Sequence, residues 1–475
     1  SLQNSRIQSG SGGITLNGYS TNTYTGSRAI YAFNSNRLLA PSGNITLKDQ
    51  TTGGMATGIE HRGNAADYLY LGADGTNMVT SSADITLQSN AITVYNGPIA
   101  YNTAGAVVIE SLGASFTTAF STWSAPMTFA GSPSSVRLGR TTNTSAITIG
   151  TSTGGGSITA AGPISVYGGA ITINTGLTAT GNNTITLSAT GTVTEGTYGF
   201  VSASNLALLG GNVTLTNASN AIGTVAASGV SSFTYADSDA LTIGTVGATA
   251  GIAATGAISV STLTGDLTLG ANVTTTTTTS SALLLNAGKS AAAGTAAGGN
   301  LLISGTPTLS VGTGGTIKLM TGSVANSTGL TSLVGSGTGR FRYNADETTN
   351  FALASWTNLG SGMYAIYREQ PTATPDNLNQ VITYGDSFAL STTATGLVNG
   401  DTLSQSLVSP LYSSGRLNAK VTPYSISNNL TKLGYNVTAN TLTVNPKVLN
   451  NNLGVQAITK VYDGSASIKI GRAHV

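Results

Sequence analysis

A short pattern of one apolar, one polar and one apolar residue recurs between Asn44 and Leu319. Most copies use β-branched residues and are flanked by Gly, Asn or Asp, which tolerate the backbone angles of tight turns. Apolar side chains at every second position are typical of a short strand with one buried face. The chain is therefore predicted to form many short strands separated by turns. The copies include NITL from Asn44, DITL from Asp84, AITIG from Ala146, TITL from Thr184, NVTL from Asn212, AISV from Ala257, DLTL from Asp266 and TIKL from Thr316.

Two longer segments repeat each other closely. Residues 92–103 have the sequence ITVYNGPIAYNT and residues 164–175 have the sequence ISVYGGAITINT, so Ile, Val, Tyr and Asn recur at matching places. Pairs of such units recur at roughly twenty residues, which is typical of stacked solenoid repeats. No helical period separates them, so the strands are expected to stack as coils that hydrogen-bond to one another.

The predicted fold class is all-β, with a right-handed parallel β-helix over residues 1–340 and a small β-rich domain after it. Inward Ile, Val and Leu side chains would form apolar columns, whereas outward Thr and Ser keep a high strand preference and stay in water. The residues expected to point inward are Ile92, Val94, Ile164, Val166, Ile171, Ile173, Ile185 and Leu187.

The composition differs from that of an ordinary soluble enzyme. Charged residues make up 8% of the chain, well below the roughly 25% of a typical domain. Disorder is disfavoured because 40% of the residues are apolar and the formal net charge is only +2. The 19 Lys and Arg residues form no basic stripe, so no nucleic-acid partner is expected. The chain has no Cys and no apolar run of the ~18 to 20 residues that a membrane helix needs, so neither disulfides nor membrane insertion is predicted.

The pattern changes near Phe341, where aromatic and charged residues become frequent. Residues 341–373 are predicted to cap the last coil, which would otherwise expose its core, and to lead into a stiff extended linker, PTATP. A separate β-rich domain is expected at residues 374–446, and a further one is expected to start at residues 447–469.

Motifs in the last quarter of the chain carry a family resemblance. Solenoid coils followed by GMYAIYREQP, ITYGDSFAL, GLVNGDTLS and ITKVYDGSAS resemble large bacterial exoproteins of the filamentous-haemagglutinin kind, which are exported by two-partner secretion. Residues 382–446 are similar to an MBG domain, and the KVYDG segment at residues 460–464 resembles the opening of a truncated YDG domain. The MBG marks fall on Tyr384, Gly385 and Asp386, on Asn399, Gly400, Asp401 and Leu403, and on Thr441, Leu442, Thr443, Val444 and Pro446.

This resemblance implies a secreted or cell-surface protein outside the outer membrane, which serves as a rigid stalk in adhesion or biofilm contacts. It implies an outer-membrane secretion pore as the partner during export, and glycans or proteins of host cells or of a matrix as binding partners. The final residues 470–475, IGRAHV, match the translation of a common sequencing adapter and are expected to be an artefact at the end of a gene fragment.

Apart from His474 in that final segment, His61 is the only histidine. A general-acid role beside Glu60 and Arg62 is conceivable, but three adjacent residues on a strand alternate between its faces and do not converge. We predict instead that His61 lies in a solvated turn. No G-x-S-x-G motif supports a nucleophile that would use this histidine.

Asp237 and Asp239 form the best carboxylate pair of the solenoid and could share a face with Tyr235. Parallel β-helices include polysaccharide lyases and hydrolases, so paired carboxylates are relevant. The pair lacks the further charged residues that a sugar site or a calcium site assembles, so a polar turn is the favoured interpretation. No catalytic, cofactor-binding or metal-binding residue is predicted, and the protein is expected not to be an enzyme. The alternatives are a β-helix polysaccharide lyase or hydrolase and a glycan-binding spike like that of a phage tail fibre.

Overall fold

The computed structural model describes residues 1–19, 27–50, 57–121, 127–349, 359–408 and 417–448. These residues belong to two compact units. Unit 1 contains Ser1–Thr374 with Ala394–Thr402 and Asn429–Val437, and unit 2 contains Pro375–Thr393, Leu403–Asn428 and the residues from Thr438 onward. The predicted adapter artefact, and all but the first two residues of the predicted YDG-like segment, lie outside the described residues.

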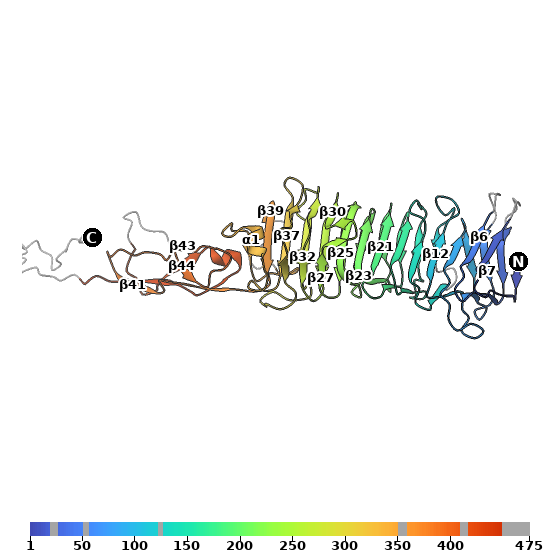
Figure 1. The fold of residues 1–475 in the computed structure, drawn as a ribbon. Coiled ribbons are helices and arrows are strands. Elements are labelled where there is room, and N and C mark those ends of the chain that lie inside the picture. Colours follow the sequence, from blue (N-terminus) through green and yellow to red (C-terminus); the bar gives the residue numbers. More distant parts are fainter. Residues whose placement is uncertain (20–26, 51–56, 122–126, 350–358, 409–416, 449–475) are drawn as a thin grey trace, which may run out of the picture. The chain divides into compact units, whose positions relative to one another are not determined.

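Unit 1 is a row of β-coils that pair strand to strand in parallel sheets (Figure 1). This arrangement confirms the predicted all-β parallel β-helix. One face is built from β1 (Leu2–Gln3), β4 (Arg28–Phe33), β7 (Thr57–Arg62) and β10 (Ile92–Tyr95), and a second from β2 (Arg6–Gln8), β5 (Asn36–Leu39), β8 (Leu69–Gly72), β11 (Ile99–Asn102) and β14 (Met127–Ala130).

Two further ladders are longer, and the first of them begins in the first coil. The first joins β3 (Ile14–Gly18), β6 (Ile45–Asp49), β9 (Ile85–Gln88), β12 (Ala106–Glu110), β15 (Ser135–Leu138), β18 (Ile164–Gly168), β21 (Thr184–Ala189), β23 (Phe200–Leu209) and β25 (Ala221–Val230). The second joins β13 (Phe120–Ser121), β16 (Ile147–Ile149), β19 (Ile171–Ile173), β22 (Thr192–Glu195), β24 (Asn212–Leu215), β26 (Ser232–Asp237), β31 (Ile258–Thr262), β34 (Leu283–Asn286), β37 (Thr316–Thr321), β39 (Gly362–Tyr367) and β38 (Phe341–Arg342).

The core of unit 1 consists of apolar columns that run from coil to coil. Along the first ladder one column contains, in register, Ile14, Ile45, Ile85, Val107, Val136, Ile164, Ile185, Leu206 and Val225. All of these side chains are buried. Each fully buried aliphatic side chain contributes about 1.5–3 kcal/mol, so burial repeated in every coil is the main stabilising term of the stack.

Seven of the eight residues predicted to point inward are buried, which confirms the predicted strand faces. Ile92 differs because it is only partly buried. It pairs with Ile59 of β7 on one side, whereas β10 is the last strand of its sheet among the described residues, which supply no partner for Ile92 on the other side. An edge position therefore leaves part of an inward side chain uncovered.

The two copies of the twelve-residue repeat form strand–corner–strand segments in different sheets. The first copy supplies β10 and β11, whereas the second supplies β18 and β19. Coil length also varies, because Ile45 pairs with Ile85 while Ile164 pairs with Ile185. The repeat therefore encodes a corner between two short strands, and loops of different length connect the corners.

Outward positions on the second ladder are mostly threonine. Thr148, Thr172, Thr194, Thr214 and Thr234 lie in register on five successive coils. The first ladder departs from this rule at Ala207 and Ala226, which pack against Val246. Val246 lies in the antiparallel hairpin of β28 (Thr245–Val246) and β29 (Thr249–Ala250), so small side chains occur where the hairpin covers the sheet.

Within the segment predicted as a cap and linker, the described residues 341–349 and 359–373 complete the last coils of unit 1. β39 pairs with β37 and β38 pairs with β39, and the short helix α1 (Leu330–Val334) contacts β39. The segment predicted as a stiff extended linker forms strand β40 (Thr372–Pro375), which pairs with β45 (Asn436–Val437). It is paired because residues from the MBG-like region belong to unit 1.

Unit 2 has a small sheet of its own. Its strands lie in the order β41 (Gln380–Thr383), β46 (Thr441–Asn445), β44 (Tyr424–Asn428) and β43 (Gln405–Leu407). Buried Leu417, Tyr424, Leu442 and Val444 form its core. The predicted domain at residues 374–446 is thus divided between the two units, and its assignment as an MBG domain stays a prediction.

Candidate functional site

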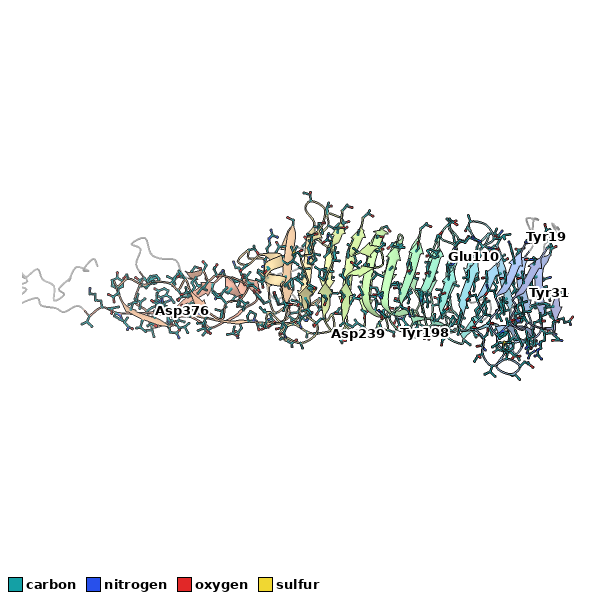
Figure 2. The ribbon with its side chains drawn as sticks, viewed as in Figure 1. Tyr19, Tyr31, Glu110, Tyr198, Asp239 and Asp376 are labelled. Atoms are coloured by element: carbon teal, nitrogen blue, oxygen red, sulfur yellow. The ribbon has the colours of Figure 1, made fainter. Side chains whose placement is uncertain are left out.

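The predicted carboxylate pair does not form one open site. Asp237 lies at the end of β26 and is fully buried, and its Oδ2 accepts a hydrogen bond of 2.6 Å from the Tyr235 hydroxyl. Asp239 is exposed and lies at an edge of the coil stack in Figure 2. The Asp239 backbone N–H donates to Asp237 Oδ1 over 3.2 Å. The expected contact between Tyr235 and Asp237 exists, but the two carboxylates face different surroundings.

A second acid that the sequence analysis missed lies on an inner column. Glu195 follows Ile149 and Ile173 in register, at a place where neighbouring coils carry an apolar residue. Its Oε1 is buried and has no hydrogen-bond partner among the described residues. Burial raises the pKa of Glu195 to about 7, and burial likewise raises the pKa of Asp237 to about 7.

Both acids are connected to the backbone of neighbouring strands, Glu195 through Asn220 and Asp237 directly. Asn220 Nδ2 donates to Glu195 Oε2 over 3.2 Å, and Asn220 Oδ1 accepts from the Val201 N–H over 2.9 Å. Asp237 Oδ2 also accepts from the Ile222 N–H over 2.9 Å. Buried polar groups that are hydrogen-bonded in this way fix the strands that they join. We call Glu195, Asn220, Tyr235 and Asp237 the acid cluster.

The part of the sequence that contains the acid cluster has no basic residue that could serve as a counter-charge. Between Arg140 and Lys289 the chain contains no Lys, Arg or His. A carboxylate without a counter-charge in a low-dielectric interior is neutral more readily than an exposed one. Since Asp237 is sealed inside the coil, it cannot contact a polysaccharide outside, and the cluster therefore lends no support to a hydrolase site.

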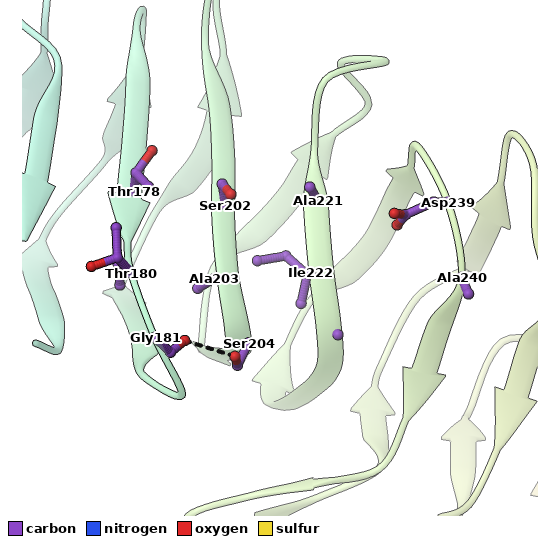
Figure 3. Close-up of a pocket in the computed structure, with 12 residues that line it drawn as sticks. Thr178, Thr180, Gly181, Ser202, Ala203, Ser204, Ala221, Ile222, Asp239 and Ala240 are labelled. Carbon is purple, nitrogen blue, oxygen red and sulfur yellow. Dashed lines mark hydrogen bonds between the residues drawn. The ribbon is translucent and has the colours of Figure 1, made fainter. Parts of the chain in front are cut away.

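A groove of about 420 Å³ lies above the acid cluster, on the outside of the stack (Figure 3). Its sides carry the hydroxyls of Thr178 and Ser202 and the carboxylate of Asp239. Its remaining lining residues are Ala179, Thr180, Gly181, Ala203, Ser204, Ala221, Ile222, Gly223 and Ala240. The volume lies within the roughly 300–1,000 Å³ that small-molecule sites occupy.

His61 is buried, so the predicted solvated turn is wrong. It lies in β7, where its Nδ1 is 3.2 Å from the Ala32 carbonyl and its Nε2 is 3.1 Å from the Asp67 carbonyl. Burial lowers the pKa of His61. Glu60 and Arg62 point to the opposite face, as strand alternation predicts, and form an ion pair there over 3.2 Å. The three residues do not converge on one site.

The other marked charges in the early coils also serve as structural contacts. Glu110 accepts from Arg137 over 2.7 Å and from Arg140 over 2.7 Å. Gln88 adds a third hydrogen bond to Glu110 over 2.8 Å. These contacts bridge neighbouring coils, because β12 lies between β9 and β15.

The two aspartate turns of the MBG-like region have different roles. In the YGD turn, Asp386 is exposed and accepts the Thr383 N–H over 3.0 Å, as expected for turn chemistry. In the NGD turn, Asp401 is buried and accepts from Tyr343 over 2.7 Å and from Tyr435 over 2.9 Å. Asp401 therefore fastens its turn to the last coils of unit 1.

Replacing Asp401 by Ala should destabilise the end of unit 1 by about 2–4 kcal/mol, because two buried tyrosine hydroxyls lose their acceptor. Hydrogen exchange of α1 and β38 would report the change. Asp386→Ala is the matched control, since it removes an aspartate from an exposed turn and should leave the exchange of α1 unchanged. Equal exchange of α1 in the wild type and in Asp401→Ala would contradict the fastening role.

Within the described residues, no three His, Cys, Asp or Glu side chains are grouped so that they could hold a metal ion. In the described part of the chain, none of the helices has both the length and the apolar character needed to span a membrane. Comparisons of the chain with protein-family models, with curated proteins and with solved structures found no match. The function of the groove and of the acid cluster therefore has to be inferred from the residues that form them.

Proposed function

We propose that this protein is a secreted or cell-surface exoprotein whose coils form a non-catalytic stalk for adhesion or biofilm contacts. The observation that carries the proposal is the unbroken succession of coils with aliphatic columns inside and threonine rows outside. Each coil hydrogen-bonds to its neighbours, so added coils extend the stack without a new core design. Such a scaffold can extend by added coils and can present the same kind of contact surface on each coil.

Repetition also suits weak binding. Hydroxyl side chains recur on successive coils at a strand spacing of about 4.8 Å. Once one weak contact with a surface has formed, the neighbouring hydroxyl groups are held close to the same surface, so their effective concentration is high. Many weak contacts together therefore give avidity. The central coils carry almost no charge, since only four acids and no bases occur between Arg140 and Lys289. Binding through these coils should therefore depend little on salt.

Adhesion should fall stepwise when whole coils are removed. Deletion of residues 258–282 removes β31 and the strands up to β33 (Val273–Thr275), and it brings Phe233 next to Leu283 in the same column. Deletion of residues 85–106 removes another coil and places Val107 where Ile85 was. We expect partial loss of binding to glycan-coated surfaces in each deletion and greater loss in both. Complete loss after one deletion, or collapse of binding in moderate salt, would contradict the proposal.

Purified protein should release no reducing ends or unsaturated sugars from neutral or acidic polysaccharides, because Asp237 is fully buried and Glu195, which is partly buried, has its Oε1 enclosed. Chromatography of the digested polysaccharides would check this. If products form and then disappear in Asp237→Asn, a β-helix hydrolase or lyase would replace the stalk as the favoured function.

A further inference from the structure

The groove over β20 (Gly176–Ala179), β23 and β25 has a definite structural cause. Ser202 of β23 pairs in register with Ala221 of β25, and Gly223 follows two residues later. Ala221 and Gly223 have smaller side chains than Ser202 on one side and Asp239 on the other, so a trough remains between them (Figure 3). The trough extends across three neighbouring strands, since residues of β20, β23 and β25 line it.

The polar groups of the groove differ in their availability. Ser204 donates to the Gly181 carbonyl over 2.9 Å and Thr180 donates to the Ala160 carbonyl over 3.2 Å, so these hydroxyls are engaged. The Thr178 and Ser202 hydroxyls show no such bond within the described part of the chain. A hydroxyl both donates and accepts, and it therefore matches the hydroxyls of a sugar.

Charge narrows the class of ligand. Asp239 is the single charged side chain among the lining residues, and no arginine or lysine forms an ion pair with it in the described residues. A carboxylate accepts strong hydrogen bonds from hydroxyl donors, whereas it repels sulfate, phosphate and uronate groups. With no base between Arg140 and Lys289, nothing nearby offsets that repulsion. The groove thus favours an uncharged polyhydroxylated chain over an acidic one.

The floor of the groove is fixed from below. Asn220 holds the Val201 N–H at the start of β23, and Asp237 holds the Ile222 N–H at the start of β25. Both side chains are fully buried. Because these bonds set the two strand starts before any ligand arrives, binding requires little ordering of the protein.

We propose that this groove is a subsite for an uncharged glycan chain, which Thr178, Ser202 and Asp239 bind through its hydroxyls. The assignment rests on the proposed adhesive function and gives it a defined ligand class and place. Binding in this groove differs from the weak binding expected along the threonine rows, because one substitution in the groove can abolish it.

The test uses the full chain and soluble oligosaccharides of known composition. Maltohexaose, cellohexaose and chitohexaose are the uncharged probes, and polygalacturonate and heparin fragments are the acidic ones. We expect the wild type to bind at least one uncharged probe and to bind the acidic probes at least about tenfold more weakly. Stronger binding to the acidic probes would overturn the charge argument.

Two variants locate the binding. Ala221→Phe fills the trough and should weaken binding of the uncharged probe by at least about tenfold, while Asp239→Asn should weaken it by about three- to tenfold. Ser165→Phe places the same ring at an outward position of β18, outside the groove, and should bind like the wild type. Circular dichroism of all three variants should match that of the wild type.

The outcomes separate this inference from the proposed function. If Ala221→Phe is folded and binds the probe as the wild type does, the groove is not the subsite, whereas stepwise adhesion by the coils would still stand. If the wild type binds a soluble uncharged probe through the groove but adheres to no surface, the subsite stands and the adhesive function fails. Wild-type protein that binds none of the uncharged probes overturns the subsite.

Discussion

Replacing Ile164 by Asp should unfold the coils around β18 at a cost of about 4 kcal/mol or more in unfolding free energy. Ile164 is fully buried between Val136 and Ile185 in an apolar column. A carboxylate there would have no counter-charge and no hydrogen-bond donor, so it would either break the column or force water into it. Urea unfolding followed by circular dichroism would measure the loss.

The adjacent residue offers a matched control. Ser165 lies on the same strand but points outward, so Ser165→Asp should change the unfolding free energy by less than about 1 kcal/mol. Hydrogen exchange should show lost protection in coils near β18 and unchanged protection in the sheet of unit 2, which has its own core. Similar stabilities for the two Asp variants would contradict the assignment of inner and outer faces.

The stability of unit 1 should also depend on pH through the acid cluster. In the folded state the pKa of Glu195 and that of Asp237 are raised to about 7 by burial, well above the ordinary values of 4.5 and 3.8. Below the unfolded-state pKa both states carry the protons and neither acid costs stability. Between the unfolded-state pKa and the folded-state pKa, the folded protein holds a proton that the unfolded chain has lost. The unfolding free energy therefore falls as pH rises, by about 3 kcal/mol for Glu195 and about 4 kcal/mol for Asp237. The fall should lie between about pH 4 and pH 7.

The double variant Glu195→Gln/Asp237→Asn isolates this effect. His61, whose pKa is lowered by burial, acts in the opposite direction, and Asp401, whose pKa is raised by burial, acts in the same direction as the cluster. The informative quantity is therefore the difference in unfolding free energy between the variant and the wild type. That difference should grow in favour of the variant as pH rises. Parallel pH profiles for the double variant and the wild type would refute the role of the cluster.

The columns of unit 1 could be predicted because strand alternation leaves few choices. Once Ile164 and Val166 lie on one face of a strand, Ser165 must lie on the other. Register between coils follows, because shifting a strand by one residue would expose its whole apolar set. The incomplete burial of Ile92 could not be predicted in the same way, since it depends on which strand ends a sheet.

Alternation also contained signals that the sequence analysis did not use. Glu195 in TVTEG stands where ITI at residues 171–173 has its second isoleucine, so aligning these units places the acid inside. His61 follows Ile59 by two residues and therefore shares its inward face. Glu195 and His61 are polar residues at inward positions that are apolar in most coils. Only the structure shows which neighbours stabilise them, such as Asn220, which donates a hydrogen bond to Glu195.

The groove and the division of the C-terminal region depend on contacts between distant segments. Ser202 and Ala221 meet Asp239 only because three successive coils stack, and no local motif marks the trough. Asp401 looks like an ordinary turn residue in GLVNGDTLS, yet its partners Tyr343 and Tyr435 are 58 and 34 residues away in sequence. Such pairings are set by the fold and have no local signature.

The absence of bases between Arg140 and Lys289 has a consequence for resistance to proteases. Trypsin-like proteases cut after Lys or Arg, so they find no cleavage site in the coils from β16 to β34. This holds when the coils open briefly as well as when they are closed. The same stretch offers no lysine amine to crosslinking or acylating reagents. The coils between Arg140 and Lys289 thus resist trypsin-like proteases through their composition. The coils on either side contain Lys and Arg and resist such proteases only while they are folded.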